Sequence, residues 1–478
     1  MGANRLRRFV GIIIAAAALG AALLLWATVG RSSPPNGEPP SVGTLFGVWQ
    51  VFYDPVAPTP RLILAAIALA ALCAVGIALL ERRASNVSRR STNLHATPLA
   101  PKIIMASTHG TFAGEVSVTV LIPAHNEEAS LPLTLFSLRA QSTPPQRVIV
   151  VADNCTDATV VIAHQHGVEV FESVANTDKK AGALNQALAQ ILPGQGDNEI
   201  VMVMDADTTL DDGFLQEAVS RFTHDRALMA IGGLFYGEEG FELLGQLQRN
   251  EYTRYSREIA RRRGRVFVLT GTASMFRPIA LRTVAERRSV TVPGRHGDVY
   301  DTAALTEDNE LTLALKSLGA LMTSPAKCSV VTELMPTPGA LWKQRLRWQR
   351  GALENIAAYG LTPATIRYWA QQLGIGYSVI ALTSFLLLMA VTALAVDAWV
   401  WFPFWLGLGV VFVVERVVTV WSGGWRARLL AVLLLPELLF DMFLNLVYIK
   451  GIIDITVGRQ AAWDHVTRES TVQARADA

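Results

Sequence analysis

The chain has 478 residues, of which 51% are hydrophobic and 17% are charged, and its formal net charge at pH 7 is +2. This composition is apolar for a soluble protein, and the small net charge argues against a nucleic-acid partner. The three cysteines are Cys73, Cys155 and Cys328. Their wide spacing fits neither a disulfide framework nor a zinc site.

Long apolar runs gather near the two ends of the chain. Five of them are each roughly long enough to cross a bilayer: Phe9–Val29, Leu62–Leu80, Gln372–Ala395, Trp399–Val414 and Leu429–Ile449. The first run could instead be a cleaved signal peptide because arginines precede it, although its apolar core is long for such a segment. Pro436 could divide the last run into a re-entrant piece and a span. We therefore expect about five or six transmembrane helices.

Arginine clusters beside these runs predict the membrane topology. Arg5–Arg8, Arg82–Arg90 and Arg416–Arg428 should face the cytoplasm. Residues 81–370 would then be cytoplasmic, and the Pro-rich stretch 31–60 would lie outside. The side on which the C-terminus lies stays open, because five spans favour the outside whereas its basic residues favour the inside. We expect an integral protein of the plasma membrane.

The segment between residues 117 and 204 alternates strand and helix patterns. Short apolar runs predict strands at Ser117–Ile122, Val148–Ala152, Val168–Phe171 and Ile200–Met204. Helical spacing of apolar residues predicts helices at Glu128–Gln141, Asp157–His166 and Ala181–Leu192. This alternation predicts a mostly parallel sheet covered by helices.

Polar clusters follow three of the predicted strands: "PAHNEE" after the first, "DNCTD" after the second and "DADTT" after the fourth. Ligands bind beyond the carboxyl ends of the strands in such sheets, so we expect a site there. The first strand is not followed by the dinucleotide fingerprint G-x-G-x-x-G, and the sequence contains no G-x-x-x-x-G-K-[ST] loop. These absences argue against a hydride-transfer enzyme and a P-loop ATPase.

Asp205 and Asp207 follow a buried strand as two like charges one residue apart. A solvated loop would tolerate such a pair, and so would a divalent cation bound between them. An EF-hand is excluded, because Leu210 stands where Gly is required and Gln216 where Glu is required. The remaining metal interpretation is Mg²⁺ or Mn²⁺ held by one or two carboxylates and by ligand phosphates.

The stretch "LTEDNELTLAL" (305–315) predicts a helix with Thr306 as its N-cap and with Glu307 and Asp308 in its first turn. Acidic residues favour a helix N-terminus because of its dipole, which is one explanation of the pattern. The other explanation is that Asp308 points out of the helix end as a proton acceptor. The stretch alone leaves both explanations open.

The stretch "ALWKQRLRWQRGALENI" (340–356) predicts a second helix near the C-terminal spans. Gln344, Arg347 and Trp348 would share one face of it, and Arg345 and Arg350 would flank them. An arginine beside an aromatic plane and an amide suits a sugar with a diphosphate leaving group. An amphipathic helix on the membrane surface explains the same pattern, and the two interpretations are compatible.

Four motifs in this order resemble those of membrane-embedded family 2 glycosyltransferases, the cellulose, chitin, hyaluronan and poly-N-acetylglucosamine synthases. They are the D, DxD, TED and QxxRW motifs, at Asp153, Asp205-Ala-Asp207, Thr306-Glu307-Asp308 and Gln344-Arg-Leu-Arg347-Trp348. The resemblance covers roughly residues 115–360. It implies an α/β fold of the GT-A type, Rossmann-like with a mostly parallel sheet, in a cytoplasmic catalytic domain joined to the transmembrane helices.

The resemblance also implies roles for individual residues. Nucleotide-sugar binding falls to Ala124, Glu127, Asp153, Lys180, Gly182 and Asp205. Asp207 would be the direct ligand of Mg²⁺ or Mn²⁺, with Asp205 beside it. Asp308 would be the general base, with Glu307 as its catalytic neighbour. Gln344 and Arg347 would bind the diphosphate, and Trp348 would support the acceptor sugar. "TGTASMFR" (270–277) matches a small-residue loop near the acceptor.

The expected domain boundaries follow from the runs and motifs together. An N-terminal transmembrane hairpin would occupy residues 1–100, and the GT-A domain residues 101–336. Amphipathic interface helices carrying QxxRW would occupy residues 337–371, and a C-terminal transmembrane region with a short tail residues 372–478.

The expected reaction is transfer from a UDP-sugar with inversion, because one base opposite the leaving group implies a single displacement. A retaining double displacement fits less well, since a second carboxylate nucleophile is not evident. We expect UDP-N-acetylglucosamine as donor and processive growth of a β-linked polysaccharide exported through the protein's own helices. Alternatives are single transfer to a lipid carrier and a non-enzymatic membrane scaffold. The expected partners are the donor, the polysaccharide or lipid acceptor, the bilayer and an accessory subunit at the outer face.

Overall fold

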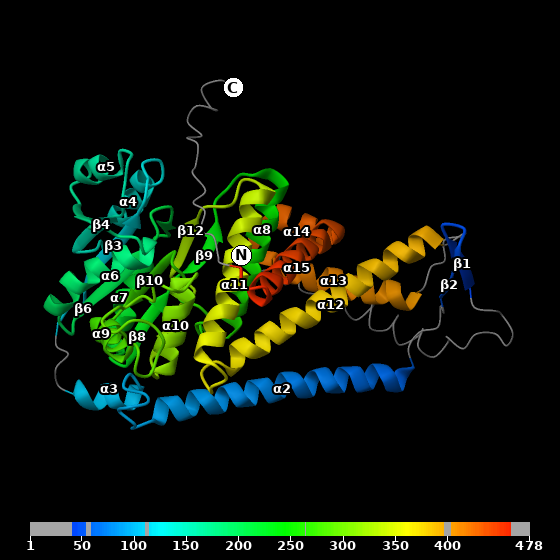
Figure 1. Cartoon of the computed structure of the whole chain (residues 1–478), viewed down its shortest axis with the longest axis horizontal. Coiled ribbons are helices and arrows are strands. Elements are labelled where there is room, and N and C mark those ends of the chain that lie inside the picture. The colour runs from blue at the N-terminus through cyan, green and yellow to red at the C-terminus, as the bar shows by residue number, and fades with distance from the viewer. Residues whose placement is uncertain (1–40, 54–58, 110–113, 263, 396–402, 460–478) are drawn as a thin grey trace, which may run out of the picture. The chain divides into compact units, whose positions relative to one another are not determined.

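The structure is a computed structural model that describes residues 41–53, 59–109, 114–262, 264–395 and 403–459 (Figure 1). The chain divides into two compact units. One comprises Met1–Leu80 and Ala370–Leu446, and the other comprises Glu81–Trp369 and Val447–Ala478. The expected span Phe9–Val29 lies outside the described residues.

A seven-stranded sheet forms the centre of the second unit, in the order β11-β8-β10-β6-β3-β4-β5. Its strands are β3 (Ser117–Ala124), β4 (Arg147–Ala152), β5 (Glu169–Glu172), β6 (Glu199–Met204), β8 (Leu228–Gly232), β10 (Ala273–Phe276) and β11 (Leu321–Thr323). β10 is antiparallel to both of its neighbours, and the other pairs are parallel. The mostly parallel sheet predicted from the sequence is confirmed.

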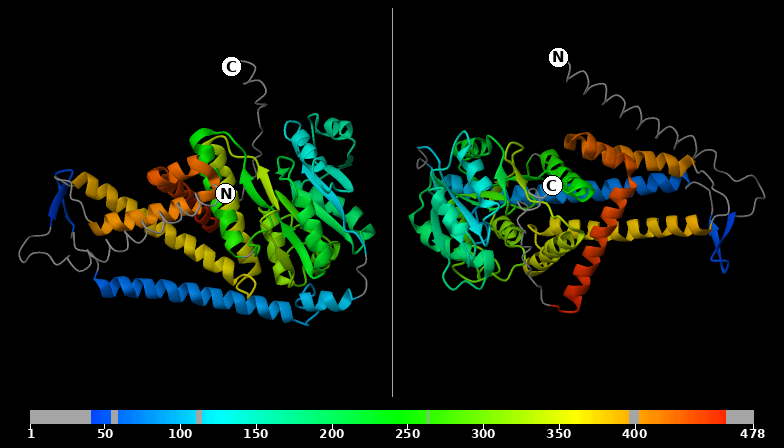
Figure 2. Two further views of the ribbon diagram at one scale, coloured as in Figure 1. Left: turned by 180° about the vertical axis from the view of Figure 1, so that it is seen from behind. Right: turned by 90° about the horizontal axis from the view of Figure 1, so that it is seen from above.

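Helices cover both faces of this sheet, because its central strands carry apolar side chains on both sides. In β6, Val201 and Val203 face one core, and Met202 and Met204 face the other. The first core is closed by α3 (Pro101–Ser107), α6 (Lys179–Ile191) with η1 (Leu192–Gly194), α9 (Pro278–Arg287) and α10 (Glu307–Ser317). The second core is closed by α4 (Leu131–Arg139), α5 (Thr159–Gln165) and α7 (Phe214–His224). The arrangement can be followed in Figures 1 and 2.

A smaller three-stranded sheet adjoins the end of β6. It contains β7 (Thr209–Leu210), β12 (Ser329–Thr332) and β9 (Leu234–Gly237) in that order. Two long helices follow these strands in the chain, α8 (Glu242–Arg261) after β9 and α11 (Pro338–Tyr359) after β12. Since β7 begins two residues after Asp207, the smaller sheet holds the chain immediately beyond the DxD motif.

Two described helices are long and apolar enough to cross a membrane, α2 (Pro60–Arg90) and α12 (Ile366–Ala395, over Ile366–Val391). A third candidate is a pair bent by 63°, formed by residues 407–419 and 421–433 of α13 (Pro403–Thr419), η2 (Trp421–Gly423) and α14 (Gly424–Leu433). Among the described residues there are therefore two candidate spans, or three if the bent pair is one span.

The expected span Leu429–Ile449 is wrong as a single helix. α14 ends at Leu433, Leu434 has a φ of 54°, and α15 (Leu435–Thr456) begins at the next residue. A branched side chain rarely adopts a left-handed backbone, so Leu434 marks a sharp break. The run is therefore divided into two pieces, as the alternative for Pro436 predicted, although the break falls at Leu434 and Pro436 itself lies in the first turn of α15, where a missing N–H is tolerated.

A hairpin not foreseen from the sequence lies within the Pro-rich stretch. β1 (Ser41–Leu45) and β2 (Trp49–Tyr53) pair antiparallel around a three-residue connection in which Phe46 and Gly47 have positive φ. Glycine adopts this conformation readily, which favours the turn at this point.

Candidate functional site

Asp153 follows the last residue of β4 and is almost fully buried. Its carboxylate accepts hydrogen bonds from Ser173 Oγ (2.7 Å), Asn176 Nδ2 (2.8 Å) and Asn154 Nδ2 (3.0 Å). These bonds fix the orientation of the carboxylate at the edge of the sheet where the site was predicted. Ala124, also expected at the nucleotide, ends β3, and its carbonyl oxygen accepts from the Asp153 backbone N–H at 2.9 Å.

Gly182 supports Asp153 indirectly. A Cβ atom at position 182 would lie 2.1 Å from Asn176 Oδ1 and 2.8 Å from Asp178 Cβ. Only glycine therefore leaves room for Asn176, which donates to Asp153. The sequence assigned Gly182 to the nucleotide, whereas the described contact is with the loop that orients Asp153.

Lys180 joins two of the predicted motifs. Its Nζ lies 2.6 Å from Asp205 Oδ1 and 3.2 Å from Glu307 Oε1. Burial lowers the pKa of Lys180, but the carboxylates of Asp205 and Glu307 outweigh it and raise the pKa well above its ordinary value. The lysine thus stays charged and holds the DxD and TED segments together.

Asp308 lies beside the same group of charges. Its Oδ2 accepts from the backbone N–H of Gly271 at 3.1 Å, and its Oδ1 accepts from the backbone N–H of Asn309 at 2.7 Å. A Cβ at Gly271 would lie 3.2 Å from Asp205 Oδ2 and 3.0 Å from Lys180 Nζ. The TED turn is therefore adjacent to the first aspartate of DxD, and Gly271 lies between them.

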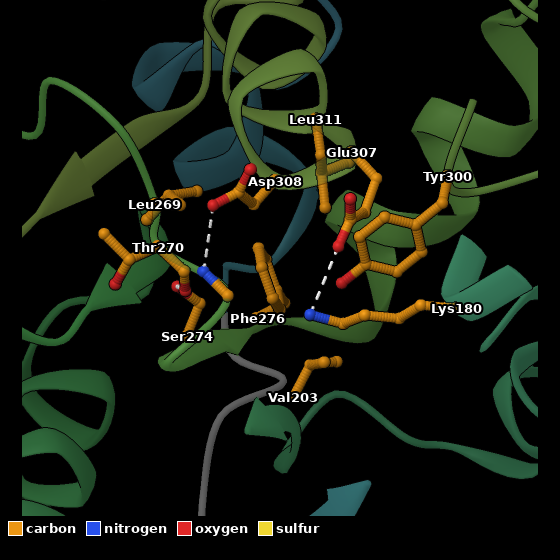
Figure 3. Close-up of a pocket in the computed structure, with 11 residues that line it drawn as sticks. Lys180, Val203, Leu269, Thr270, Ser274, Phe276, Tyr300, Glu307, Asp308 and Leu311 are labelled. Carbon is orange, nitrogen blue, oxygen red and sulfur yellow. Dashed lines mark hydrogen bonds and ion pairs between the residues drawn. The ribbon is translucent and has the colours of Figure 1, made fainter. Parts of the chain in front are cut away.

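One pocket is lined by Lys180, Glu307 and Asp308, and Figure 3 shows how they lie. The Tyr300 ring lies beside Glu307 and Lys180, while Asp308 reaches the backbone next to Thr270 (Figure 3). Burial and the negative charge of Glu307 raise the pKa of Asp308 to about 6. This carboxylate is ionised at neutral pH and still basic enough to accept a proton.

Asp207 lies among other negative charges. Burial, together with Asp205 and Glu333, raises the pKa of Asp207 to about 7. Burial likewise raises the pKa of Glu127 to about 7, despite the bond that Ser130 Oγ donates to it at 2.6 Å, and Asp207 adds to the shift. Such a group of mutually repelling carboxylates favours a bound cation.

The residues present fit a hard divalent ion that also contacts a ligand. Asp205 and Asp207 supply carboxylate oxygens, the donors that Mg²⁺ and Mn²⁺ prefer. Across the described ranges, His, Cys, Asp and Glu side chains do not form a group of three or more that could hold a metal by themselves. A ligand phosphate would therefore have to complete the coordination, as the sequence predicts.

Thr306 is the N-cap residue of α10 as predicted, with Glu307 and Asp308 in the first turn, but its side chain makes no capping hydrogen bond. Its Oγ1 instead accepts from Asn355 Nδ2 of α11 at 3.1 Å, and a Cβ at Gly351 would lie 2.5 Å from that oxygen. The hydroxyl therefore joins α10 to α11. The positive charge of Arg347 also contributes to a lowered pKa at Glu307, behind the stronger effect of Lys180.

Helix α11 carries Gln344, Arg347 and Trp348, each partly exposed. The buried cation of this motif is Arg345, which bonds Gln344 and lies over the Trp348 ring. The sequence treated Arg345 only as a flanking charge. The structure thus brings Lys180 into contact with Asp205 and Glu307 and places Asp308 in the same pocket as Lys180 and Glu307. Asp207, Glu127 and Arg347 are linked to this group through charge.

Three contributors, Gly271, Tyr300 and Glu333, were not named from the sequence, and a fourth, Arg345, was named only as a flanking charge. Gly271 lies in the loop "TGTASMFR", which was noted without choosing a residue. Glu333 directly follows β12 and so resembles the acidic residues after β4 and β6, a signal that could have identified it. Tyr300 and Arg345 act through contacts with segments distant in the chain, for which the local sequence gives no indication.

The chain is similar in sequence to curated poly-beta-1,6-N-acetyl-D-glucosamine synthases of two staphylococci. The chain is 26% identical over 245 residues to a poly-beta-1,6-N-acetyl-D-glucosamine synthase of Staphylococcus aureus (strain COL), covering 50% of this chain and 55% of that protein. It is 25% identical over 266 residues to the synthase of the same name from Staphylococcus epidermidis, covering 54% and 59%. The chain thus spans little more than half the length of these curated relatives.

Solved structures with a related fold include the mannosyltransferase PcManGT from Pyrobaculum calidifontis in complex with GDP-Man and Mn²⁺. It has a TM-score of 0.47 and 17% identity, over 83% of this chain and 99% of that one. Residues 1–349 of S. aureus TarS in complex with UDP give a TM-score of 0.36 and 18% identity, over 73% and 94%. The family described as glycosyl transferase family 2 matches residues 119–284. The chain therefore carries a glycosyltransferase family 2 domain.

Proposed function

We propose that this protein is an inverting, metal-dependent glycosyltransferase that uses a UDP-sugar to extend a β-linked polysaccharide. The observation that carries the proposal is the contact of Lys180 with both Asp205 and Glu307, with Asp308 in the same pocket. Segments more than 100 residues apart in the chain meet there. If Asp205 were only a loop residue and Asp308 only an acid at a helix N-terminus, these distant segments would not need to contact one another.

The charges of the site suit the departure of a nucleotide. Asp205 and Asp207 would hold Mg²⁺ or Mn²⁺, which when bound supplies positive charge at the diphosphate. Arg347 and Gln344 would donate to the diphosphate oxygens, and Asp153 and Glu127 would contact the uridine. The bond between the anomeric carbon and the diphosphate oxygen breaks as negative charge develops on that oxygen, so these donors stabilise the transition state.

Asp308 is the proposed general base. The acceptor hydroxyl oxygen forms the new bond to the anomeric carbon, and its proton passes to the Asp308 carboxylate. The N–H groups of Gly271 and Asn309 hold this carboxylate in place. Glu307 is neutralised by Lys180 and is the weaker candidate for the base. A single displacement inverts the anomeric configuration, so an α-linked donor gives a β-linkage.

UDP-N-acetylglucosamine is the proposed donor, and a polymer is the proposed product. The names of the staphylococcal relatives, poly-beta-1,6-N-acetyl-D-glucosamine synthases, support both. The alternative acceptor is a lipid carrier that receives one sugar. Product length separates the two, because purified enzyme supplied with donor should yield long chains, and single-sugar products would refute a polymerase.

Location in the plasma membrane is part of the proposal. The apolar residues of α2 are exposed, and so are most of those of α12, which supports insertion of these helices into lipid. In this proposal residues 1–100 and 372–478 hold the membrane segments, and residues 101–336 form the cytoplasmic catalytic domain. Residues 337–371 form the amphipathic interface helices that carry QxxRW.

Donor screening tests the proposed activity. Purified protein in detergent is incubated with each of several UDP-sugars and Mn²⁺ or Mg²⁺, and UDP release is measured. Release should be greatest with UDP-N-acetylglucosamine, should stop on chelation and should be lost in Asp308→Asn. Absence of release with every donor would overturn the proposal, and release that survives chelation would overturn its metal dependence.

A further inference from the structure

Arg345 is a buried cation in the middle of the QxxRW segment. It is only 2% exposed, although the predicted ligand-binding residues around it on α11 are all partly exposed. Isolated charges are costly to bury, so a buried arginine needs partners for its guanidinium. Arg345 has such partners on two helices.

The first set of partners lies on α8. Arg345 Nη2 donates to Glu251 Oε2 at 2.8 Å and to the Tyr252 hydroxyl at 3.4 Å. The guanidinium carbon also lies 5.5 Å from the centre of the Tyr252 ring. Tyr252 is itself buried and packs edge-on against Phe235 of β9 at 4.7 Å. The guanidinium is thus anchored to α8, whose Tyr252 packs against the smaller sheet.

The second set of partners consists of two predicted ligand-binding residues. Arg345 Nη1 donates to Gln344 Oε1 at 2.5 Å. Because an arginine has only donors, the Gln344 atom facing it must be the carbonyl oxygen, which leaves the amide NH₂ as a donor on the opposite side. The guanidinium carbon lies 4.2 Å from the centre of the Trp348 ring, a cation–π contact that restrains the indole plane.

We propose that Arg345 is a positioning residue that presets Gln344 as a hydrogen-bond donor to the diphosphate and fixes the plane of Trp348. This inference rests on the proposed function, because it concerns the same nucleotide-sugar site. Arg345 itself does not touch the ligand in this scheme. It transmits the position of Glu251 and Tyr252 on α8 to the two side chains that do.

Lysine cannot replace this arginine. An ammonium group is a point charge on a flexible stem, whereas the planar guanidinium bonds Glu251 and Gln344 from separate nitrogens while its face stacks on Trp348. Arg345→Lys keeps the charge near Glu251 but releases the Gln344 amide. The matched control is Arg350→Lys on the same helix, since Arg350 pairs with Glu354 at 2.5 Å and does not contact Gln344 in any described bond.

The test is UDP binding by calorimetry with saturating Mn²⁺, in full-length protein, with and without Gln344→Ala. Arg345→Lys should weaken UDP binding about tenfold in the wild-type background, the usual cost of a lost charge-assisted or well-oriented bond. In the Gln344→Ala background the same substitution should cost less than about twofold, because coupled residues are not additive. Arg350→Lys should bind UDP like the wild type.

A merely structural arginine would give a different result. Equal weakening in the two backgrounds would overturn the inference, and so would unchanged UDP affinity in Arg345→Lys when the wild type is active. Wild-type protein that neither binds UDP nor releases it from any donor would instead refute the proposed function itself. The two failures are therefore distinguishable.

A second variant covers the case in which Arg345→Lys does not fold. Glu251→Gln leaves the arginine in place and keeps a carbonyl acceptor for it, but removes the charge that anchors it. We expect a smaller weakening of UDP binding, about two- to threefold, that also disappears in the Gln344→Ala background. Persistence of that weakening without Gln344 would contradict the positioning role.

Discussion

Two acids on the same helix, Asp308 and Glu310, show how α10 separates chemistry from support. Glu310 is 2% exposed and receives two bonds from the fully buried Arg288, at 2.5 and 2.7 Å, and one from the Tyr359 hydroxyl at 2.5 Å. Asp308 faces the pocket and receives only two backbone N–H groups, from Gly271 and Asn309. An opposite charge neutralises the first acid, and no described bond pairs the second with a cation.

The difference indicates what each acid can do. Glu310 holds Arg288 in a buried ion pair, and Arg288 in turn donates to backbone carbonyls of the loop that leads to Tyr300. Asp308 has the negative charge of Glu307 nearby, so its proton affinity is raised. The helix thus keeps one acid as a fixed support and leaves the other able to exchange a proton.

The largest expected effect is on catalysis in Asp308→Asn. The amide cannot accept the proton of the acceptor hydroxyl, so kcat should fall about a thousandfold, within the usual range for loss of a general base. The melting temperature should change little, because an Asn side-chain oxygen can still accept from Gly271. UDP release and differential scanning fluorimetry check the two statements. Retained turnover would mean that another group is the base.

Glu310→Gln should lower the stability of the fold much more than it lowers kcat, which is the opposite of the result expected for Asp308→Asn. Removing one charge from a buried pair leaves Arg288 uncompensated and should lower stability by about 3 kcal/mol, which is several degrees in melting temperature. The kcat of the protein that remains folded should fall far less than in Asp308→Asn. Thermal unfolding and turnover per folded molecule measure this. A large loss of kcat at unchanged stability would show that Glu310 belongs to the chemistry and would remove the contrast.

The parts of the molecule that the sequence could predict are those that depend on residues close together in the chain. The four strands β3 to β6 and the helices between them follow from short-range apolar periodicity, which is local information. Asp205 could be placed at the site because it follows a strand at the predicted edge of the sheet, whereas Asp308 was placed there only by the resemblance to a known motif order. The resemblance to a known motif order supplied the rest of the catalytic assignment.

Support residues could not be predicted in this way. Arg288 and Glu310 are 22 residues apart, and Arg345 and Glu251 are 94 apart. Neither pair leaves a periodic or spacing signal, because the contact exists only after the chain has folded. Thr306 shows the same limit, since its local pattern correctly predicts where the helix begins but does not predict the contact of its hydroxyl with Asn355. Leu434 breaks a run that is continuous by composition alone.

Gly182→Ala tests whether Gly182 orients Asp153 for binding of the nucleotide. The new methyl group would collide with Asn176 and displace the donor to Asp153. We expect the KM for the donor to rise about tenfold, the cost of about one lost hydrogen bond to a charged group, with a smaller change in kcat. Gly194→Ala is the control, because no atom lies within 4 Å of the added Cβ. Steady-state kinetics that do not distinguish the two variants would refute a role of Gly182 in orienting Asp153.

The smallest expected effect is the decrease of kcat at acidic pH. Asp308 must be ionised to accept a proton, and its pKa in the folded protein is about 6. Activity should therefore rise with pH through this value, with about half of the plateau kcat at pH 6 and a tenfold loss per unit below it. Saturating Mn²⁺ keeps Asp207 ionised, so that its own raised pKa does not shape the curve. The residual turnover of Asp308→Asn should lack this inflection. If the inflection persists in that variant, the titrating group is another residue. Asp308 would then not differ from Glu310 as the acid that accepts a proton in the reaction.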